Sequence, residues 1–479
     1  MSGVTNLKSG IFWMTVFSVI AIFIGFLRNY ILSDNFAKTD VLGSYALVML
    51  FFNAIMTFGL FGGSSLVSTL IPKEINFKKK IEIFYNNIYI SLILSIFIFG
   101  LIYLNPSVLS IVFSDKIDFF IYKRSIVLIP IVIISQMCIF WLQGNLNFKT
   151  SSFLSQCQIF AFTLVIMLSY LNDSFKELII RNPYLFFVYL ILIINVLIII
   201  FVFKTEKLPF VSINKLNFPK LNFFRLGFNL YLGTILTFIY LYYDQIMITK
   251  FIGLKELGFY FLILQLVDLI RFIPQRLGQI FLASFARMIG DDDRISFQNI
   301  YKKSSENLLL LNLIISIGLI VSSKLLFNIF NIDYSKYGII FMLLILVRNI
   351  SGLGVINSMI ILSKEKSRLF LYNSFLLICF QTLIIYFTIE AYGILSVVIA
   401  QLVSTITGQL GLWLIIKRNF AEINISKLFF ANIILVLISI YSLEHKIVTH
   451  FFIQFSVLLI AFFLYKNQIQ FLSKKVMFK

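Results

Sequence analysis

The chain has 479 residues, of which 60% are hydrophobic and only 13% are charged. A water-soluble domain is about half apolar and about a quarter charged, so these proportions exclude an ordinary soluble protein. The formal net charge of +19 is expected of a membrane protein, because Lys and Arg gather in cytoplasmic loops, and it does not require a nucleic-acid partner. We therefore predict an all-α polytopic membrane protein that binds no nucleic acid.

Long apolar segments follow one another along the chain, separated by short polar connections. A transmembrane helix needs about 20 predominantly apolar residues. By this criterion the sequence predicts about 14 transmembrane helices, with ends uncertain by several residues. They lie at about 11–32, 41–70, 86–104, 124–142, 154–172, 184–203, 227–249, 257–286, 306–323, 338–362, 370–389, 391–416, 428–443 and 450–465.

The Lys and Arg residues between these segments predict the orientation. If the N-terminus is cytoplasmic, the cytoplasmic connections hold 25 of the 40 Lys and Arg, the opposite face holds 11, and four lie within the segments. The positive-inside rule then places both termini in the cytoplasm. We expect a multi-pass protein of the bacterial cytoplasmic (inner) membrane.

The motif Leu-Gly-x-Tyr occurs twice, at 42–45 and at 257–260. A shift of 215 residues aligns these copies without a gap, and it aligns the first two predicted spans with the seventh and eighth. Six spans separate the copies, so the two halves would share one orientation and enclose a central site. The predicted organisation is an N-terminal six-helix bundle at 1–203, a cytoplasmic linker at 204–226, a C-terminal six-helix bundle at 227–416, and two additional helices with a cytoplasmic tail at 417–479.

The eighth predicted span contains a polar stripe. Its polar residues recur every three or four positions, which places them on one face of a helix. Pro274 interrupts this stripe and predicts a kink. A simpler alternative is that Asp268 and Arg271 neutralise each other inside a helix bundle. The residues of the stripe are Gln265, Asp268, Arg271, Gln275 and Gln279.

Two further arginines are candidates for a cavity. Arg276 follows the stripe and should lie near the cytoplasmic rim, whereas Arg348 should lie near the centre of the membrane. An ionisable side chain at that depth costs about 2.5–3.5 kcal/mol and usually faces a partner or water. Arg348 has no acid within one helical turn. Two interpretations stay open: a bond to another span, or contact with a substrate phosphate.

Arg28 and Asp244 lie on the first spans of opposite halves, near the outer rim. We hypothesise that they approach each other as an outer gate when a cavity opens inward. The alternative is that each side chain reaches water separately. Among the acids, Asp244 and Asp268 are the two that are placed for ion coupling.

Several kinds of chemistry find no support in the sequence. There is no GxxxxGK[ST] motif for an ATP-driven pump and no Ser/His/Asp or Cys/His set that the topology would bring together. The three cysteines lie in apolar runs and there are two histidines, so we expect no metal site and no cofactor. The sequence favours a protein that is not an enzyme.

Four stretches carry a family resemblance. They are "LQGNLNFK" at 142–149, "YYDQIMITKFIGLKELGFYFLILQ" at 242–265, "IPQRLGQIFLASFARM" at 273–288 and "YGILSVVIAQLVS" at 392–404. With its predicted topology, the chain resembles the polysaccharide-transporter branch of the multidrug/oligosaccharidyl-lipid/polysaccharide (MOP) flippase superfamily, and the O-antigen repeat-unit flippases in particular.

This resemblance implies a MATE-like fold, MATE being the multidrug and toxin extrusion transporters. It also implies translocation of undecaprenyl-diphosphate-linked oligosaccharide from the cytoplasmic to the outer leaflet by alternating access. Membrane lipids, an H⁺ or Na⁺ counter-ion, a polysaccharide polymerase and a chain-length regulator are the implied partners. The alternatives are a MATE-type cation-coupled exporter and, less favoured, a membrane polymerase or glycosyltransferase. The candidate cavity residues are Arg271, Gln275, Arg276, Gln279 and Arg348.

Overall fold

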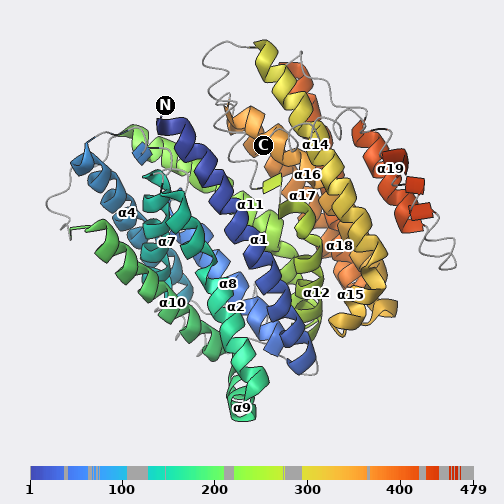
Figure 1. Ribbon diagram of the computed structural model, residues 1–479, viewed down its shortest axis with the longest axis horizontal. Coiled ribbons are helices and arrows are strands. Elements are labelled where there is room, and N and C mark those ends of the chain that lie inside the picture. The colour runs from blue at the N-terminus through green and yellow to red at the C-terminus, as the bar shows by residue number, and fades with distance from the viewer. Residues whose placement is uncertain are drawn as a thin grey trace. The chain divides into compact units, whose positions relative to one another are not determined.

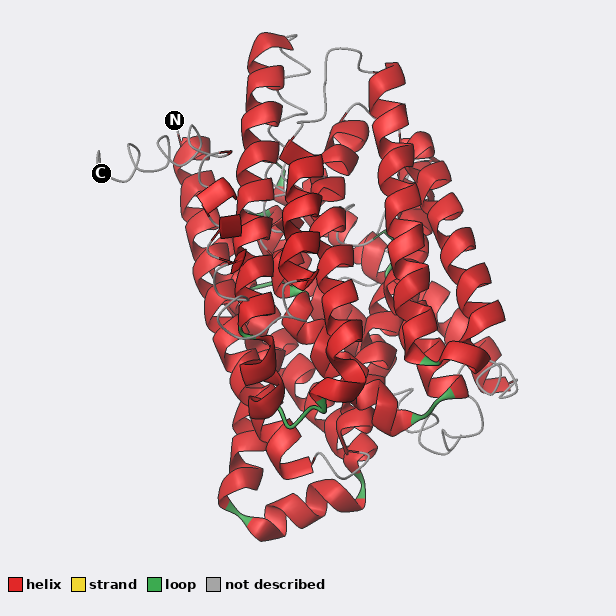
Figure 2. Cartoon of the chain, turned by 90° about the vertical axis from the view of Figure 1, so that its right-hand side faces the viewer, coloured by secondary structure: helices red, strands yellow, loops and turns green. Residues whose placement is uncertain are grey.

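The computed structural model of the protein describes most of the chain. The described residues are 2–36, 41–62, 76–104, 128–145, 147–209, 221–272, 274–275, 294–363, 367–419 and 428–441, with isolated positions at 67, 70–71, 74 and between 453 and 464. Within these residues the regular secondary structure is helical throughout and contains no strand (Figure 2). The predicted all-α class is confirmed.

The chain divides into two compact units, of which the first covers Met1–Phe259. Its helices are long, because most of them continue the apolar spans into polar flanking residues (Figure 1). They are α1 (Ser2–Phe36), α2 (Val41–Gly59), α4 (Phe77–Leu104), α7 (Leu128–Gly144), α8 (Phe148–Leu171), α9 (Asp173–Arg181), α10 (Pro183–Glu206), α11 (Leu221–Phe251) and the start of α12 (Leu254–Val267).

The second unit covers Tyr260–Lys479. After the rest of α12, its helices are α14 (Arg294–Val321), α15 (Ser323–Ile329), α16 (Tyr334–Ser363), α17 (Ser367–Tyr392), α18 (Ile394–Asn419) and α19 (Leu428–Tyr441). The boundary between the units lies inside α12, so α11 belongs to the first unit. The division drawn from the repeat, with a second bundle beginning at residue 227, stays a prediction.

Eight helices of the described residues are long and apolar enough to cross a membrane. Each coincides with a segment that hydropathy predicts, so the multi-pass architecture is confirmed. The total of 14 stays a prediction, because part of the chain, including most of the last predicted span, lies outside the described residues. The eight are at Val41–Gly59, Phe77–Leu101, Phe148–Leu171, Pro183–Glu206, Tyr301–Val321, Tyr334–Ile361, Leu371–Tyr392 and Ile394–Arg418.

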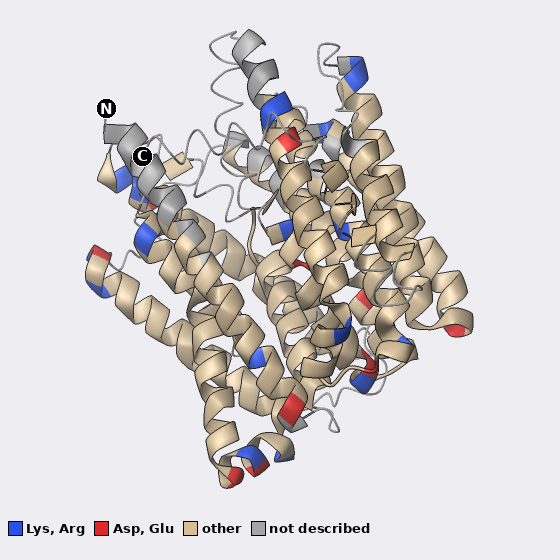
Figure 3. Ribbon diagram, turned by 45° about the vertical axis from the view of Figure 1, so that its right-hand side comes forward, with Lys and Arg blue, Asp and Glu red and all other residues tan. Residues whose placement is uncertain are grey.

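Charged residues lie mainly at helix ends, and the long middle parts of the helices are almost free of them (Figure 3). This distribution is expected for helices that cross lipid, where a charge is costly. The few charges inside the helices therefore need a structural or functional reason.

The core of the first unit is aromatic. The ring of Tyr45 on α2 packs edge-on against Phe162 of α8 and Phe187 of α10, with centroid distances of 5.4 and 5.1 Å. All three side chains are fully buried. Edge-to-face pairs contribute about 0.5–1.5 kcal/mol each beyond the area they bury. This cluster fixes α2 between α8 and α10.

Helix α2 ends at Gly59, inside the apolar segment 41–70 that hydropathy predicts as one span. Two carbonyl groups at this end accept hydrogen bonds from side chains of neighbouring helices. Tyr231 of α11 donates to the Phe58 carbonyl at 3.0 Å, and Ser95 of α4 donates to the Gly59 carbonyl at 3.2 Å. An unsatisfied backbone group in lipid costs several kcal/mol, so these hydroxyl groups permit the break.

Helices of the second unit approach each other closely at glycine residues. A Cβ atom added to Gly352 of α16 would lie 2.0 Å from Asn312 Nδ2 of α14, and one added to Gly411 of α18 would lie 2.0 Å from Asn373 Oδ1 of α17. Small residues at membrane helix interfaces permit such close approach. At the interface of α14 and α16, Asn349 of α16 donates a hydrogen bond to Ser316 of α14. Polar side chains of α14 and α16 therefore face each other and are buried from lipid.

Asp333 stabilises the N-terminal end of α16. Its Oδ1 accepts a hydrogen bond from the Ser335 hydroxyl at 2.7 Å and another from the Ser335 backbone N–H at 2.9 Å. These bonds favour the charged carboxylate, the side-chain bond most, and they lower the pKa of Asp333. Such a group stabilises the fold above its unfolded pKa, and this contribution is lost as the pH falls through the folded pKa.

We therefore expect Asp333→Ala to lower the thermal unfolding temperature in detergent at neutral pH and to have little effect at strongly acidic pH. Glu390→Ala, at an exposed position near the end of α17, is the control. An equal effect of Asp333→Ala at both pH values would contradict the capping role.

Candidate functional site

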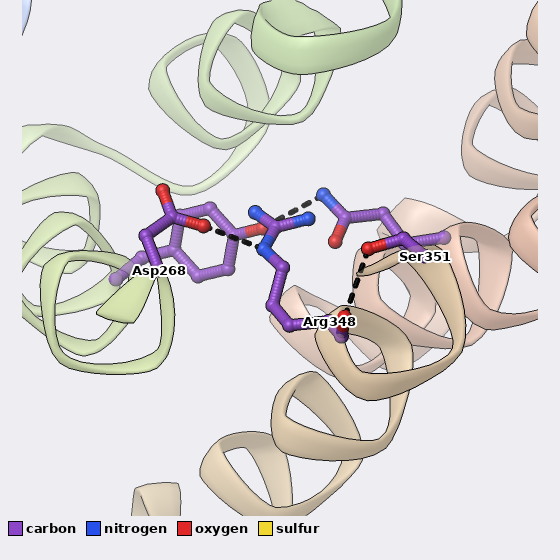
Figure 4. A network of polar contacts seen from close by, with 5 residues as sticks. Asp268, Arg348 and Ser351 are labelled. Carbon is purple, nitrogen blue, oxygen red and sulfur yellow. Dashed lines mark hydrogen bonds and ion pairs between the residues drawn. The ribbon is translucent and has the colours of Figure 1, made fainter. Parts of the chain in front are cut away.

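The second unit contains an ion pair between two helices. Arg348 of α16 donates from Nε to Asp268 Oδ1 at 2.6 Å, and Figure 4 shows the two side chains pointing toward each other. The Arg348 side chain is 5% exposed, whereas that of Asp268 is 47% exposed. The guanidinium is therefore enclosed by protein while its counter-charge is open to the surroundings.

Asp268 lies where α12 becomes irregular. Helix α12 ends at Val267, and Asp268 occupies a turn before the next helical residues. Its N–H still bonds to the Leu264 carbonyl at 2.8 Å, but its own carbonyl accepts from the N–H groups of both Arg271 and Phe272, at 3.0 and 3.1 Å. The bond to Arg271 spans three residues, which is the tighter spacing of a 3₁₀ turn. The carboxylate therefore projects from a tightened turn rather than from a regular helix.

A second polar contact joins α12 to α18. Gln401 Nε2 donates to the hydroxyl of Tyr260 at 3.2 Å, and both side chains are buried. Tyr260 is the tyrosine of the second Leu-Gly-x-Tyr copy. Gln401 is not among the predicted site residues, although an amide within an apolar run is a signal that could have identified it. The contact fixes α12 against α18 two helical turns before Asp268.

The Asp268–Arg348 pair agrees with the first interpretation of Arg348, and contact with a substrate phosphate stays a prediction. The arginine bonds to another span, and the acid that it meets belongs to the predicted polar stripe. A buried charge is tolerated when it is paired. Asp268 is half-exposed, so the carboxylate side of the pair is the accessible one. The arrangement is thus a buried arginine whose negative partner is accessible.

Arg28 forms a separate cluster in the first unit. Its Nε and Nη2 atoms donate to Asn29 Oδ1 at 3.1 and 2.9 Å, and its guanidinium carbon lies 5.1 Å from the centroid of the Tyr45 ring. The residue is 3% exposed. Asp244 on α11 is fully buried, and its Oδ1 accepts from the backbone N–H of Gln245 at 2.8 Å. Among the described contacts Arg28 and Asp244 are not paired, so the outer gate stays a prediction.

The other candidate residues lie as follows. Arg271 is partly buried, and Gln265 and Gln275 are exposed. Arg276 and Gln279 lie outside the described residues. Within the part of the chain that the structure describes, no group of three His, Cys, Asp or Glu side chains is arranged to hold a metal ion. Of the predicted site residues, the structure thus brings together Asp268 and Arg348.

A comparison with protein families gives one match. The model of the family described as "polysaccharide biosynthesis protein" matches residues 7–282, which is more than half of the chain. No curated protein sequence matches the chain.

The chain is similar in fold to solved structures of a flippase and of MATE transporters. An inward-closed structure of the lipid II flippase MurJ has a TM-score of 0.69 at 14% identity and covers 95% of this chain and 99% of its own. An inward-facing MATE multidrug transporter of the MOP superfamily has a TM-score of 0.63 at 12% identity, covering 85% and 98%. A D35N mutant of the Vibrio cholerae MATE transporter VcmN has a TM-score of 0.59 at 13% identity, covering 90% and 100%. The predicted MATE-like fold is confirmed.

Proposed function

We propose that this chain, which belongs to the polysaccharide biosynthesis protein family, is a flippase of the MOP superfamily that acts on lipid-linked oligosaccharide. Its cargo would be an undecaprenyl-diphosphate-linked repeat unit of O-antigen or capsule. The cargo would move from the cytoplasmic to the outer leaflet by alternating access. Family membership supports the polysaccharide pathway, and the likeness to MurJ and MATE structures supports the transporter fold.

The observation that carries this proposal is the Asp268–Arg348 ion pair. A diphosphate is an anion with several acceptor oxygens, and the planar guanidinium of arginine binds such groups at two points. In the absence of cargo, Asp268 neutralises Arg348 and makes the buried cation tolerable. When a diphosphate approaches, it can take the place of the half-exposed carboxylate. This exchange would keep Arg348 paired throughout the transport cycle.

The same pair supplies a way to couple transport to a counter-ion. Protonation of Asp268 would remove its charge and free Arg348 for the diphosphate, and deprotonation after release of the cargo would restore the ion pair. An inside-negative membrane potential also favours outward movement of anions, by about 2.3 kcal/mol per charge per 100 mV. We propose H⁺ as the counter-ion at this site, with Na⁺ as the alternative.

A MATE-type exporter of cations is the second candidate, since MATE transporters share the fold. A cavity for organic cations would favour acids that are free of arginine partners. At the described pair, Asp268 is instead occupied by Arg348. This observation favours an anionic cargo over a cationic one. A polymerase or glycosyltransferase is less favoured still, because the family match and the fold neighbours point to transport.

The proposal is tested by transport in reconstituted vesicles. The purified chain would be inserted into liposomes with a fluorescent lipid-diphosphate oligosaccharide, and the fraction reached by a membrane-impermeant glycosidase would be followed over time. We expect the protein to accelerate transfer between leaflets. Arg348→Met should slow this transfer by about tenfold or more, equivalent to about 1.4 kcal/mol of lost interaction.

The matched control is Arg368→Met, which removes an exposed arginine on α17 and should leave transfer unchanged. A parallel assay of cationic dye efflux separates the two candidate functions. Dye export without lipid transfer would replace the flippase by a cation exporter. Equal transfer by wild type and Arg348→Met would remove the diphosphate-binding role of Arg348.

A further inference from the structure

A pocket lies between α9 and α10 of the first unit. Its volume is about 590 Å³. It combines charged, polar and apolar side chains, a mixture that a lipid-facing helix surface does not normally show. The lining residues that matter here are Glu177, Leu178, Arg181, Asn182, Leu185 and Tyr189.

The pocket is preformed because α9 is fixed at both ends. Helix α8 ends at Leu171, and the side chain of Asn172 accepts hydrogen bonds from the N–H groups of Ser174 and Phe175, which begins α9. The ring of Phe175 packs edge-on against Phe186 of α10 at 5.8 Å. Pro183 is the first residue of α10, a position that suits its fixed φ. This short helix is thus held as a bridge between two long apolar helices, at their common end (Figure 1).

The exposed side chains around this bridge change from apolar to charged. On the apolar side, Leu178 is 54% exposed, and Leu171 and Tyr189 are also exposed. Helix α9 itself contains acidic and basic residues, and Figure 3 shows red and blue ribbon segments at this end of the helices. Short amphipathic helices with this composition lie at the boundary between acyl chains and headgroups, where tyrosine is also enriched.

The charges inside the pocket are of opposite sign and lie one helical turn apart. Glu177 and Arg181 are spaced i, i+4 on α9, and both line the pocket. Neither forms an ion pair with another residue in the part of the chain that the structure describes. One cation and one anion are therefore presented side by side to whatever enters the pocket. A ligand with a single charge would match only half of this arrangement.

We propose that this pocket binds the headgroup of a phospholipid that carries an amine, of the phosphatidylethanolamine class. Arg181 pairs with the phosphate and Glu177 with the ammonium group, which a two-carbon bridge holds next to that phosphate. The acyl chains lie along Leu178, Leu185 and Tyr189 toward the apolar surface of α8 and α10. The bound lipid anchors α9 at the headgroup level. This inference does not depend on the transported cargo.

Native mass spectrometry of the full-length protein in detergent tests the proposal, with phosphatidylethanolamine, phosphatidylglycerol and phosphatidylcholine titrated separately. We expect a site that prefers phosphatidylethanolamine. Arg181→Gln should weaken binding of all three lipids by about threefold to tenfold, because the phosphate loses a charge-assisted partner. Glu177→Gln should weaken phosphatidylethanolamine alone by a similar factor of about threefold to tenfold.

Lys302→Gln and Glu390→Gln are matched controls, since they remove exposed charges from α14 and α17. Both should leave lipid binding unchanged, and the thermal unfolding temperature of every variant shows whether it is folded. Equal affinity for phosphatidylglycerol, unaltered by Glu177→Gln, would reduce the site to a phosphate contact and overturn the proposal. Binding that neither pocket variant changes would overturn it as well.

Discussion

Asp268→Asn should destabilise the protein more than removal of both members of the ion pair. The single change leaves the 5% exposed guanidinium of Arg348 without its carboxylate. Breaking a buried pair in this way costs about 3–5 kcal/mol. Because the Asp268 side chain is 47% exposed, solvent screening reduces the expected cost to about 1–3 kcal/mol. Thermal unfolding in detergent measures the difference.

The double variant Asp268→Asn/Arg348→Met is the variant to compare with Asp268→Asn. It replaces the buried cation by an apolar side chain of similar length, so stability should return to within about 1 kcal/mol of wild type. Transport of lipid-diphosphate oligosaccharide should not return. A stable but inactive double variant separates the functional role of Arg348 from its packing role. A double variant that is as unstable as Asp268→Asn would contradict the assigned electrostatics.

Gly43→Ala should cause the second large effect. Gly43 is in the first Leu-Gly-x-Tyr copy, and a Cβ atom there would lie 2.2 Å from the Leu254 carbonyl oxygen and 2.7 Å from its carbon. Backbone atoms cannot move aside as a flexible side chain can. Overpacking of this kind costs about 1–3 kcal/mol. We expect a correspondingly lower thermal unfolding temperature.

Two other glycines serve as graded controls for Gly43→Ala. A Cβ atom on Gly258 would lie 3.0 Å from the Gly43 nitrogen, a longer contact than the 2.2 Å at Gly43, so Gly258→Ala should cost less. Nothing lies within 4 Å of such an atom on Gly100 of α4. Gly100→Ala should therefore be neutral or stabilise the helix by about 0.5–1 kcal/mol. Any other order of the three variants would show that steric contact does not explain the glycine at 43.

Hydropathy was sufficient to predict the fold class. Long apolar runs are readable without tertiary information, because lipid imposes the same requirement on every span. Helix ends were less predictable. Helix α10 continues to Glu206 and α11 begins at Leu221, so both extend into the predicted linker. The break of α2 after Gly59 was also missed, because the side chains that compensate it come from α4 and α11.

The candidate site was only partly predictable. Helical spacing identified Asp268 as part of a polar stripe, since residues three and four apart share a face. Its partner Arg348 is 80 positions away, and no local pattern connects two residues at that separation. The repeat likewise showed that Gly43 and Gly258 are equivalent, but not that they lie against each other. Contacts between distant helices depend on how the helices pack. The spacing of residues along a single sequence does not reveal this packing.

The hydrogen bonds at the end of α2 have a consequence for how this helix can move. Its Phe58 and Gly59 carbonyl groups accept hydrogen bonds from the hydroxyl groups of Tyr231 and Ser95. The Ser95 hydroxyl is also within reach of the Ser91 carbonyl, at 2.5 Å, so it has a second acceptor when the first moves away. We expect α2 to change its angle at this joint by exchanging acceptors, without admitting water to the bilayer. A transporter that swings a helix in this manner can reorient at low energetic cost while staying impermeable to ions.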